Sequence, residues 1–481
     1  MKNNQNWSIE NSYIELPSKL YSKQLPEKVL NPKTIYFNSN LALDLGLEFL
    51  SEREILDYFS GNVIPKGAVS VSQAYAGHQF GNFTVLGDGR AILLGELITP
   101  KKIRYDIQLK GSGRTPYSRQ GDGRATLSSV LREYIISEAM YSLGIPTTRS
   151  LAIIQSGEKV YRHETHDGGV LTRISSSHIR FGTFEFVSRF CSKDDLKIFT
   201  KYVIGRHYPQ VLNTENPTLA LFELVMIKQI DLIIDWMRVG FIHGVMNTDN
   251  ISIAGETIDY GPCAFMNAYN PNTVFSSIDK NGRYSFGNQP KITYWNLVVL
   301  ANALIPIISD NQQESVGLAT EKLNKFSTIF SNSWYDMMYK KLGIINPIEK
   351  DKNLVDSLLE LMNNKKADYT NTFAALTLNT RSDDSLFTSS KFKKWEREWK
   401  VRIYSSNNSD DSFKLMQTQN PLVIPRNHLV ELALENSKNG NYNECNDLID
   451  LVSNPYNYIC NYEFQTTPEG YDSSYKTFCG T

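Results

Sequence analysis

The sequence predicts an α+β fold with two lobes, and two patterns along the chain support this prediction. From Asn82 to residue 180, short apolar runs separated by Gly- and Pro-containing turns are typical of antiparallel strands, with one intervening helix. Apolar residues recur at helical spacing through residues 291–440. Because domains usually contain about 100–200 residues, a chain of 481 residues is expected to form a β-rich first lobe, a helical second lobe and a cleft between them.

Composition and charge exclude several classes of protein. Apolar residues make up 41% and charged residues 21% of the chain, which is an ordinary globular balance. The 50 basic and 51 acidic residues nearly cancel, so no nucleic-acid partner is expected. The most apolar runs, 218–237 and 295–308, contain charged residues or a proline, so no membrane partner is expected. The absence of a signal-peptide pattern and of any Cys-x-x-Cys pair indicates a reducing, cytoplasmic compartment.

The order of elements follows from periodicity and from start and stop signals. Tyr105, Ile107 and Leu109 alternate with polar residues, which marks a half-buried strand at the end of a predicted antiparallel meander. Pro217 and Gly240 bound a long predicted helix. The expected elements are a helix at 43–59, strands at 83–86, 91–98 and 103–110, a helix at 126–143, strands at 151–155 and 170–174, and a helix at 217–238. The expected domains are an N-terminal extension (1–75), an N-lobe (76–180), a C-lobe with the catalytic and metal-binding loops (181–310) and a helical C-terminal extension (311–481).

A glycine turn lies between the first two expected strands of the meander. Gly87, Gly89 and Arg90 belong to a Gly-Asp-Gly-Arg sequence, and Asp-Gly between apolar runs is a strong hairpin signal by itself. The functional alternative is that the glycines let backbone N–H groups approach a phosphate, to which Arg90 adds positive charge.

A lysine and a glutamate follow in an order that lets them meet. Lys110 ends the third strand and Glu133 lies on the next helix. A Lys–Glu pair of this kind fixes the ammonium group so that it can hold an anionic oxygen, although a strand lysine is more often solvated. Arg173 and Arg180 add positive charge farther along, where a surface salt bridge is the plainer interpretation.

The glycine-rich stretch before that helix contains Arg114, Arg119 and Arg124. Arginines on a loop with free N–H groups suit a polyanion. A solvated basic loop explains the same pattern equally well.

The strongest local pattern surrounds Asp249, Asn250 and Asp259. A hairpin at 251–258 is expected to bring Asn250 and Asp259 together at its open end. An amide oxygen and a carboxylate suit Mg²⁺ completed by water and phosphate oxygens, and Asp249 is then available to deprotonate a hydroxyl nucleophile. The plainer alternative is that these residues only form turns. His243 lacks a His-Glu-x-x-His context, so a packed side chain is expected there.

The order of these parts is similar to that of a protein kinase, with two departures. The usual His-Arg-Asp is absent, and Asp249 and Asn250 are adjacent instead of separated. These departures and several longer motifs resemble the selenoprotein O family over residues 13–481. The motifs are AYAGHQFG (74–81), LGDGRAILLGE (86–96), QLKGSGRTPYSRQGDGRA (108–125), HGVMNTDNISI (243–253), TIDYGP (257–262), NPLVIPRN (420–427) and the near-terminal Cys479.

The resemblance implies a kinase-like (pseudokinase) fold that binds ATP in a reversed orientation. It implies transfer of AMP to Ser, Thr or Tyr hydroxyls of proteins, with release of pyrophosphate and possible self-modification. By the same resemblance, Glu133 pairs with Lys110, Asp249 accepts the proton, and Asn250 and Asp259 hold Mg²⁺ or Mn²⁺. The implied nucleotide contacts are Gly87, Gly89, Arg90, Lys110, Asp122, Gly123, Arg173, Arg180 and Asp259.

Three alternatives to AMP transfer stay open at this point. They are transfer of UMP with Mn²⁺, ordinary phosphoryl transfer by a kinase, and nucleotide binding without turnover. Bacterial members of that family often carry a cysteine in the loop after Asp-Tyr-Gly that can pair with the near-terminal one, and this chain has Phe275 there. Cys263 is then the nearest alternative partner for a regulatory disulfide with Cys479.

Overall fold

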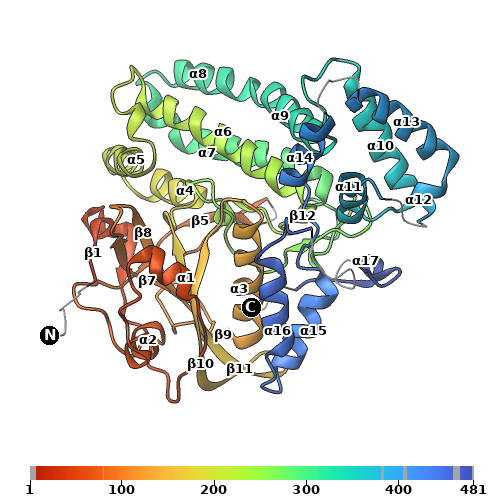
Figure 1. The fold of residues 1–481 in the computed structure, drawn as a ribbon. Coiled ribbons are helices and arrows are strands. Elements are labelled where there is room, and N and C mark those ends of the chain that lie inside the picture. Colours follow the sequence, from red (N-terminus) through yellow and green to blue (C-terminus); the bar gives the residue numbers. More distant parts are fainter. Residues whose placement is uncertain (1–6, 80, 381–383, 405–408, 459–465, 479–481) are drawn as a thin grey trace.

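The computed structural model has a mixed α+β fold in which an antiparallel sheet precedes a largely helical part (Figure 1). The structure describes residues 7–79, 81–380, 384–404, 409–458 and 466–478. Within these residues the main sheet has nine strands along the path β2–β4–β7–β8–β11–β10–β3, with β1 beside β7 and β9 beside β11. The strands are β1 (Ile9–Glu10), β2 (Tyr21–Lys23), β3 (Lys33–Phe37), β4 (Val71–Gln73), β7 (Ala91–Ile98), β8 (Arg104–Lys110), β9 (Ala125–Thr126), β10 (Arg149–Tyr161) and β11 (Thr165–Ser175).

The predicted meander is correct for two strands and wrong for the first. β7 and β8 pair antiparallel, with Leu97 opposite Tyr105. The first strand, β6 (Asn82–Val85), pairs instead with β5 (Ala76–Gln79) in a separate two-stranded sheet. The physical reason is that β1 and β4, both from the first 75 residues, already pair with β7.

The helix expected at 43–59 is two helices, α1 (Ser39–Leu45) and α2 (Glu52–Phe59). Gly46 ends α1 in the left-handed conformation, and Ser51 starts α2 with a capping box, so the chain stops and restarts its helix between them. Both helices cover one face of the sheet, where their apolar side chains share a core with β7, β8, β10 and β11.

The predicted helix at 126–143 is confirmed as α3 (Leu127–Ser142), which covers the other face of the sheet. Val130 and Leu131 of α3 belong to one buried cluster with Leu171 of β11. The expected strands at 151–155 and 170–174 are the central parts of the longer β10 and β11, whose polar ends extend beyond the core.

The helical part begins after β11, and the predicted helix from Pro217 to Arg238 is confirmed with the same bounds. Asn216 caps it by accepting a hydrogen bond from the Leu219 backbone. A short β12 (Phe241–Ile242) and β13 (Ala264–Phe265) pair near its end. The helices are α4 (Phe181–Phe190), α5 (Lys193–His207), α6 (Pro217–Arg238), α7 (Gln289–Ile308), α8 (Gln312–Asn324), α9 (Phe326–Lys341), α10 (Asp351–Lys365), α11 (Tyr369–Leu378), α12 (Ser385–Thr388), α13 (Ser390–Tyr404), α14 (Ser409–Gln419), α15 (Asn427–Ser437), α16 (Asn443–Val452) and α17 (Tyr471–Ser474). The 3₁₀ helices are Ser12–Glu15, Ser18–Leu20, Pro209–Val211, Thr248–Asn250 and Phe286–Asn288.

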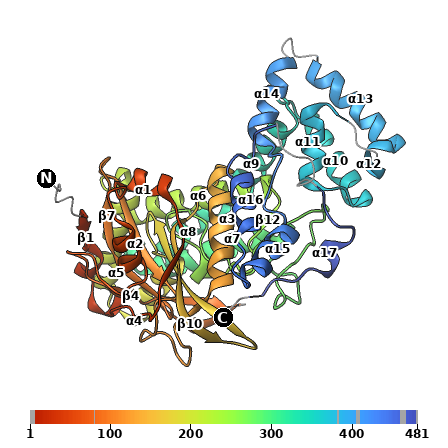
Figure 2. The same ribbon diagram turned by 60° about the horizontal axis from the view of Figure 1, so that its bottom comes forward.

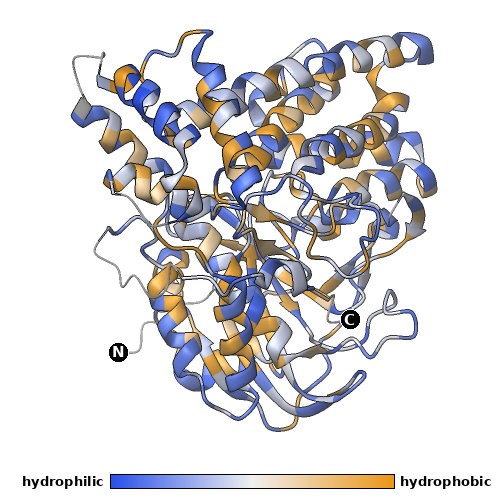
Figure 3. Cartoon of the chain, turned by 90° about the vertical axis from the view of Figure 1, so that its right-hand side faces the viewer, coloured by the Kyte–Doolittle hydropathy of each residue, from blue (hydrophilic) through white to orange (hydrophobic). Residues whose placement is uncertain are grey.

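Two features of the helical part bear on the site. α15 and α16 return to pack against α3, so residues near the end of the chain support a helix of the sheet region (Figure 2). Hydrophobic and hydrophilic residues alternate along the helices, as expected where each helix buries one face (Figure 3). Phe286–Ile308, the one such segment in the described residues, is long and apolar enough to span a membrane, but half of its most apolar window is buried and α7 packs against α4, α6 and α8.

Candidate active site

Lys110, Glu133 and Arg173 meet where β8, α3 and β11 come together. Lys110 Nζ lies 2.6 Å from one carboxylate oxygen of Glu133, and Arg173 Nε donates to the other at 2.5 Å. The predicted pair of Lys110 with Glu133 is therefore confirmed. Burial and the nearby Arg173 together lower the pKa of Lys110 to about 8. Burial alone would raise the pKa of Glu133, but Arg173 and Lys110 outweigh burial and hold this pKa below its usual value.

Asp259 lies at the centre of the cationic groups. Arg173 Nη2 donates to its Oδ1 at 2.6 Å, Lys110 Nζ is 3.8 Å from the same oxygen, and Arg180 contacts the other oxygen. Burial opposes ionisation, but Arg180, Arg173 and Lys110 hold the pKa of Asp259 well below its usual value. Asp259 also has a left-handed backbone, with φ of 63°, which is rare for residues other than glycine. Five of the residues singled out in the sequence, Lys110, Glu133, Arg173, Arg180 and Asp259, thus form one group, which we call the cationic cluster.

Arg180 joins this cluster to Asp249. Its Nη1 donates to the backbone carbonyl of Asp249 at 2.5 Å while also contacting Asp259. The carboxylate of Asp249 is buried, and its Oδ1 has no hydrogen-bond partner in the part of the chain that the structure describes. Burial raises the pKa of Asp249 to about 6, even though Arg180 opposes this change. A buried carboxylate with an unused acceptor atom is suited to accept a proton from a substrate.

The predicted hairpin at 251–258 is wrong. Ser252 bridges to Arg180 and Thr257 bridges to Thr147, so the two arms pair with neighbouring segments and not with each other. Local sequence cannot show this, because both partners lie more than 70 residues away along the chain. The short helix Thr248–Asn250 and the Arg180 side chain position the Asp249 region instead.

The donor chemistry near Asp259 fits a hard divalent ion. The amide nitrogen of Asn250 donates to the Val245 carbonyl at 3.0 Å, which leaves the amide oxygen as its ligand atom. One carboxylate and one amide oxygen suit Mg²⁺, which usually keeps water and substrate phosphate oxygens as its other ligands. Among the described residues no group of three or more His, Cys, Asp or Glu side chains could hold a metal alone. That Asn250 and Asp259 share one ion stays a prediction.

The glycine turn lies next to Lys110 and needs its glycines for close packing. A Cβ on Gly87, which has φ of 148°, would lie 2.3 Å from the Tyr117 ring, and one on Gly89 would lie 2.9 Å from the Tyr117 carbonyl. The backbone N–H of Gly111 donates a hydrogen bond to the backbone carbonyl of Arg90 at 2.7 Å. The turn is therefore not a simple hairpin, because the loop after Lys110 covers it.

Asp88, between those glycines, is a buried residue that the sequence interpretation missed. Its carboxylate accepts hydrogen bonds of 3.2 Å from the Gln73 backbone and from the Gln108 side chain. Burial raises the pKa of Asp88 to about 6. An Asp-Gly pair between apolar runs indicates an exposed turn, so no local pattern reveals this burial.

Asp122 and Gly123 are held apart from the cationic cluster by partners of their own. Arg162 donates to both carboxylate oxygens of Asp122, at 2.7 and 3.1 Å. A Cβ on Gly123 would lie 2.1 Å from the backbone of Gly113. No contact among the described residues joins Asp122 to the cationic cluster, so its contact with nucleotide stays a prediction.

His78 and Glu185 lie beside Asp249 and were also missed. The His78 backbone donates to the Thr248 hydroxyl at 3.0 Å, and His78 Nδ1 lies 2.6 Å from Glu185 Oε2. Burial raises the pKa of Glu185 to about 7. The only sequence signal was the motif AYAGHQFG, which contains His78. His243, by contrast, is buried and stacks on Trp236, as expected for a packed residue.

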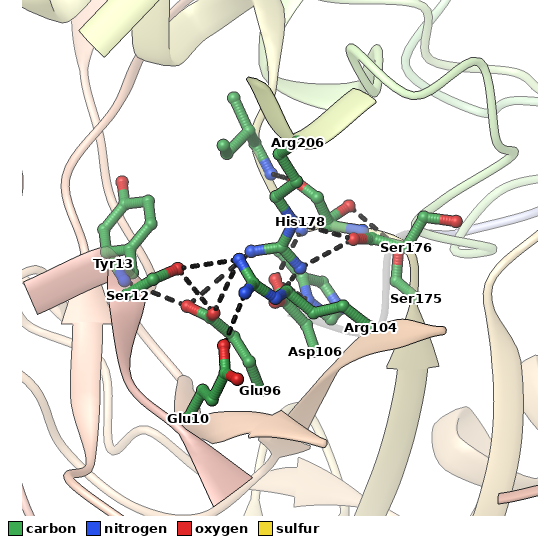
Figure 4. Close-up of polar contacts among 12 residues, drawn as sticks. Glu10, Ser12, Tyr13, Glu96, Arg104, Asp106, Ser175, Ser176, His178 and Arg206 are labelled. Carbon is green, nitrogen blue, oxygen red and sulfur yellow. Dashed lines mark hydrogen bonds and ion pairs between the residues drawn. The ribbon is translucent and has the colours of Figure 1, made fainter. Parts of the chain in front are cut away.

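A second polar network supports the turn that connects Arg173 to Arg180. Asp106 accepts from the His178 backbone at 2.8 Å and from Arg206 Nη2 at 2.6 Å, and these side chains converge in Figure 4. Glu96, on the adjacent strand, accepts from the Ser12 hydroxyl and the Tyr13 backbone. The N-terminal segment, two strands and α5 therefore hold the 175–180 turn together.

The predicted disulfide concerns a residue, Cys479, that lies outside the described residues. Cys263 is buried with a free thiol, and burial raises the pKa of that thiol to about 12. The Thr477 backbone donates to the Phe275 carbonyl at 2.8 Å, and the rings of Phe275 and Tyr475 are 5.7 Å apart. The tail therefore lies along the loop that follows Asp259.

Comparison with known proteins identifies the family. The family model described as protein adenylyltransferase SelO matches residues 4–453. The chain belongs to the SelO family of protein adenylyltransferases. The predicted resemblance and the predicted enzyme class, nucleotidyltransferase, are confirmed by this match.

Similar proteins align with this chain over nearly their whole length. The protein nucleotidyltransferase YdiU of Bacillus mycoides is 51% identical over 485 residues, which covers 100% of this chain and 99% of that protein. The protein nucleotidyltransferase YdiU of Clostridium botulinum is 51% identical over 479 residues, and that of Bacillus cereus is 50% identical over 486 residues. These alignments cover at least 98% of this chain and of each relative.

Proposed function

We propose that this SelO-family protein transfers AMP from ATP to Ser, Thr or Tyr hydroxyls of proteins and releases pyrophosphate. Membership of the protein adenylyltransferase family supports protein nucleotidylation. The observation that carries the proposal is the convergence of Lys110, Arg173 and Arg180 on Asp259, beside the buried carboxylate of Asp249. Three cations around one carboxylate suit a polyphosphate, and the adjacent carboxylate suits a hydroxyl.

The fold that goes with this activity is a kinase-like one with two lobes, in which ATP lies reversed so that its α-phosphorus faces the acceptor. The antiparallel sheet with α3 forms the first lobe, and α4 to α7 form the second. Gly87, Gly89 and Arg90 contact the nucleotide from the first lobe, and Asp122 and Gly123 contact it from the glycine-rich loop. The adjacency of the glycine turn to Lys110 supports the first of these contacts.

Each side chain has one task in the reaction. Lys110, Arg173 and Arg180 hold phosphate oxygens and stabilise the negative charge that passes to the pyrophosphate. Glu133 positions Lys110 and Arg173 through the ion pairs at 2.6 and 2.5 Å. Asn250 and Asp259 would hold Mg²⁺ or Mn²⁺, which would neutralise phosphate charge when bound.

The chemical step is a substitution at the α-phosphorus. The acceptor oxygen forms a bond to that phosphorus, the bond to the oxygen that bridges to the β-phosphate breaks, and the acceptor proton passes to Asp249. With a pKa of about 6, Asp249 is ionised at neutral pH and can accept this proton.

Labelled ATP tests the proposal directly. With ATP labelled at the α-phosphate the label is expected on protein, including the enzyme itself, whereas ATP labelled at the γ-phosphate is expected to leave protein unlabelled. Label from the γ-position alone would instead indicate an ordinary kinase. Labelling that is unchanged in both Asp249→Ala and Asp259→Ala would indicate that the site only binds nucleotide. Competition between ATP and UTP, in Mg²⁺ and in Mn²⁺, decides between AMP and UMP.

A further inference from the structure

A continuous row of cations and aromatic rings lies beside Asp249. Arg189 is stacked over the Phe83 ring at 3.7 Å, and Arg283 lies 4.9 Å from the Trp295 ring centre. His78 lies between the two rings, 5.4 Å from Phe83 and 5.3 Å from Trp295. We call these five residues the cation–aromatic row. It combines side chains from the β5–β6 sheet, the end of α4, the loop before α7 and α7 itself.

This row is joined to the segment that carries Asp249. The His78 backbone donates to the Thr248 hydroxyl at 3.0 Å, and Tyr284, next to Arg283, donates to the Asn247 side chain at 2.5 Å. A Cβ on Gly77, the neighbour of His78, would lie 2.2 Å from Asp249 Oδ1. The row is therefore fixed directly to the segment that carries Asp249.

The two arginines of the row lie near two acids, Glu185 and Asp279, without forming ion pairs with them in the described part of the chain. Neither guanidinium, of Arg189 or of Arg283, forms an ion pair with a carboxylate in the described part of the chain. The acids close to the row are engaged or buried: Asp279 accepts from the backbones of Arg283 and Tyr284, and Glu185 lies buried against His78. Burial lowers the pKa of His78, and Arg189 and Arg283 lower it further, as expected in a positive local field.

The row is also accessible and held in place. Arg189 is exposed, Arg283 and Trp295 are half-buried, and Phe190, which stacks on Phe83, is 42% exposed. Guanidinium groups stacked on aromatic rings keep their donor edges available while losing side-chain freedom. Such groups bind carboxylates well, because less entropy is lost on binding.

We propose that the cation–aromatic row binds an acidic segment of the acceptor protein, so that hydroxyls with Asp or Glu residues close by are the preferred substrates. The inference rests on the proposed protein nucleotidylation, and it names the acceptor class. The net charge of −1 gives the whole molecule no general attraction for acidic proteins, so the selectivity comes from this face.

Three synthetic peptides test the inference with the full-length enzyme. They share a central Ser-Thr-Tyr acceptor sequence and differ only in flanking residues, which are Asp and Glu, Ala, or Lys. Transfer of α-phosphate label is expected to have the lowest KM for the acidic peptide, by about tenfold against the Lys peptide, because two partly exposed charge contacts each contribute a few-fold.

Charge reversal provides the second measurement. In the double variant Arg189→Glu with Arg283→Glu, the KM of the acidic peptide is expected to rise about tenfold and that of the Lys peptide to fall. The gain for the Lys peptide cannot arise from misfolding. Arg397→Glu, on the distant helix α13, is the matched control and should keep the wild-type preference.

The outcomes separate the two proposals. Equal labelling of the three peptides, or labelling of none, overturns the role of the row, while α-label on the enzyme itself leaves the proposed function standing. A tenfold rise in the KM for ATP in the double variant also overturns it, since the arginines would then hold the nucleotide. If no protein or peptide receives α-label, the proposed function itself is overturned.

Discussion

Glu133 and Arg173 form an ion pair of 2.5 Å in which each side chain is only 2% exposed. Their partners, Lys110 and Asp259, extend the pair into a chain of alternating charges. A buried pair of this kind adds little net stability, but removing one member leaves the other charged and unpaired. The cluster is therefore sensitive to single substitutions.

Glu133→Gln is expected to lower both stability and activity. It leaves Lys110 and Arg173 without their shared carboxylate, which should reduce the free energy of unfolding by about 3–5 kcal/mol. Urea unfolding followed by circular dichroism measures the first effect, and α-label incorporation measures the second. Glu435→Gln, which breaks an exposed pair with Lys438, is the control and should cost less than about 1 kcal/mol. Equal losses in the two variants would contradict the argument.

Asp249→Asn is expected to reduce transfer about 10²- to 10⁴-fold, because the acceptor hydroxyl loses its proton acceptor. ATP binding, measured by calorimetry, should persist because the Asp249 backbone carbonyl still accepts from Arg180. Asp231→Asn, at an exposed position on α6, should keep the wild-type rate. If Asp249→Asn keeps a rate within tenfold of wild type, Asp249 is not the proton acceptor.

Gly77→Ala should impair the site because the added methyl group would collide with the Asp249 side chain. The added Cβ would lie 2.2 Å from Asp249 Oδ1, so either the β5–β6 sheet or the Asp249 side chain must move. Transfer is expected to fall at least tenfold. Gly205→Ala is the control, because its Cβ meets nothing within 4 Å and alanine stabilises a helix interior by about 0.5–1 kcal/mol. Thermal unfolding and label incorporation in both variants check the contrast.

Asp88→Asn should stabilise the fold at neutral pH and remove part of its pH dependence. Burial raises the pKa of Asp88 from 3.8 to about 6, so the folded state holds this proton more tightly than the unfolded state. The resulting stability is full below about pH 4 and is lost as the pH rises through 6. Asparagine keeps an oxygen for Gln73 and Gln108 without the cost of burying a charge.

The gain for Asp88→Asn at pH 7.5 is expected to be about 1–3 kcal/mol in urea unfolding. The difference from wild type should shrink toward pH 4. Asp194→Asn, exposed on α5, should stay within about 0.5 kcal/mol of wild type at every pH. A variant less stable than wild type at pH 7.5 would show that the charged form of Asp88 is favoured in the fold.

Features with local causes could be predicted from the sequence. The bounds of α6 follow from Asn216, Pro217 and the stop at Gly240, all adjacent to the helix they define. The Lys110–Glu133 pair follows from a strand, a loop and a helix that are consecutive in the chain. In both cases residues that are close in the sequence determine the structure, so the sequence alone was enough to predict it.

Features that depend on distant partners could not be predicted. β6 pairs with β5 because β1 and β4 already occupy the edge of β7. The segment at 251–258 forms no hairpin because Ser252 and Thr257 bridge to Arg180 and Thr147. The row beside Asp249 likewise joins residues from 78 to 295, and no single stretch of sequence shows it.

The packing of α15 and α16 on α3 has a consequence for biosynthesis. Arg132, the neighbour of Glu133, donates to Glu431 at 2.8 Å across a sequence separation of 299 residues. A ribosome therefore completes the sheet and α3 long before it makes the two helices that cover α3. The nascent polypeptide therefore acquires the packing behind Glu133 only near the end of translation.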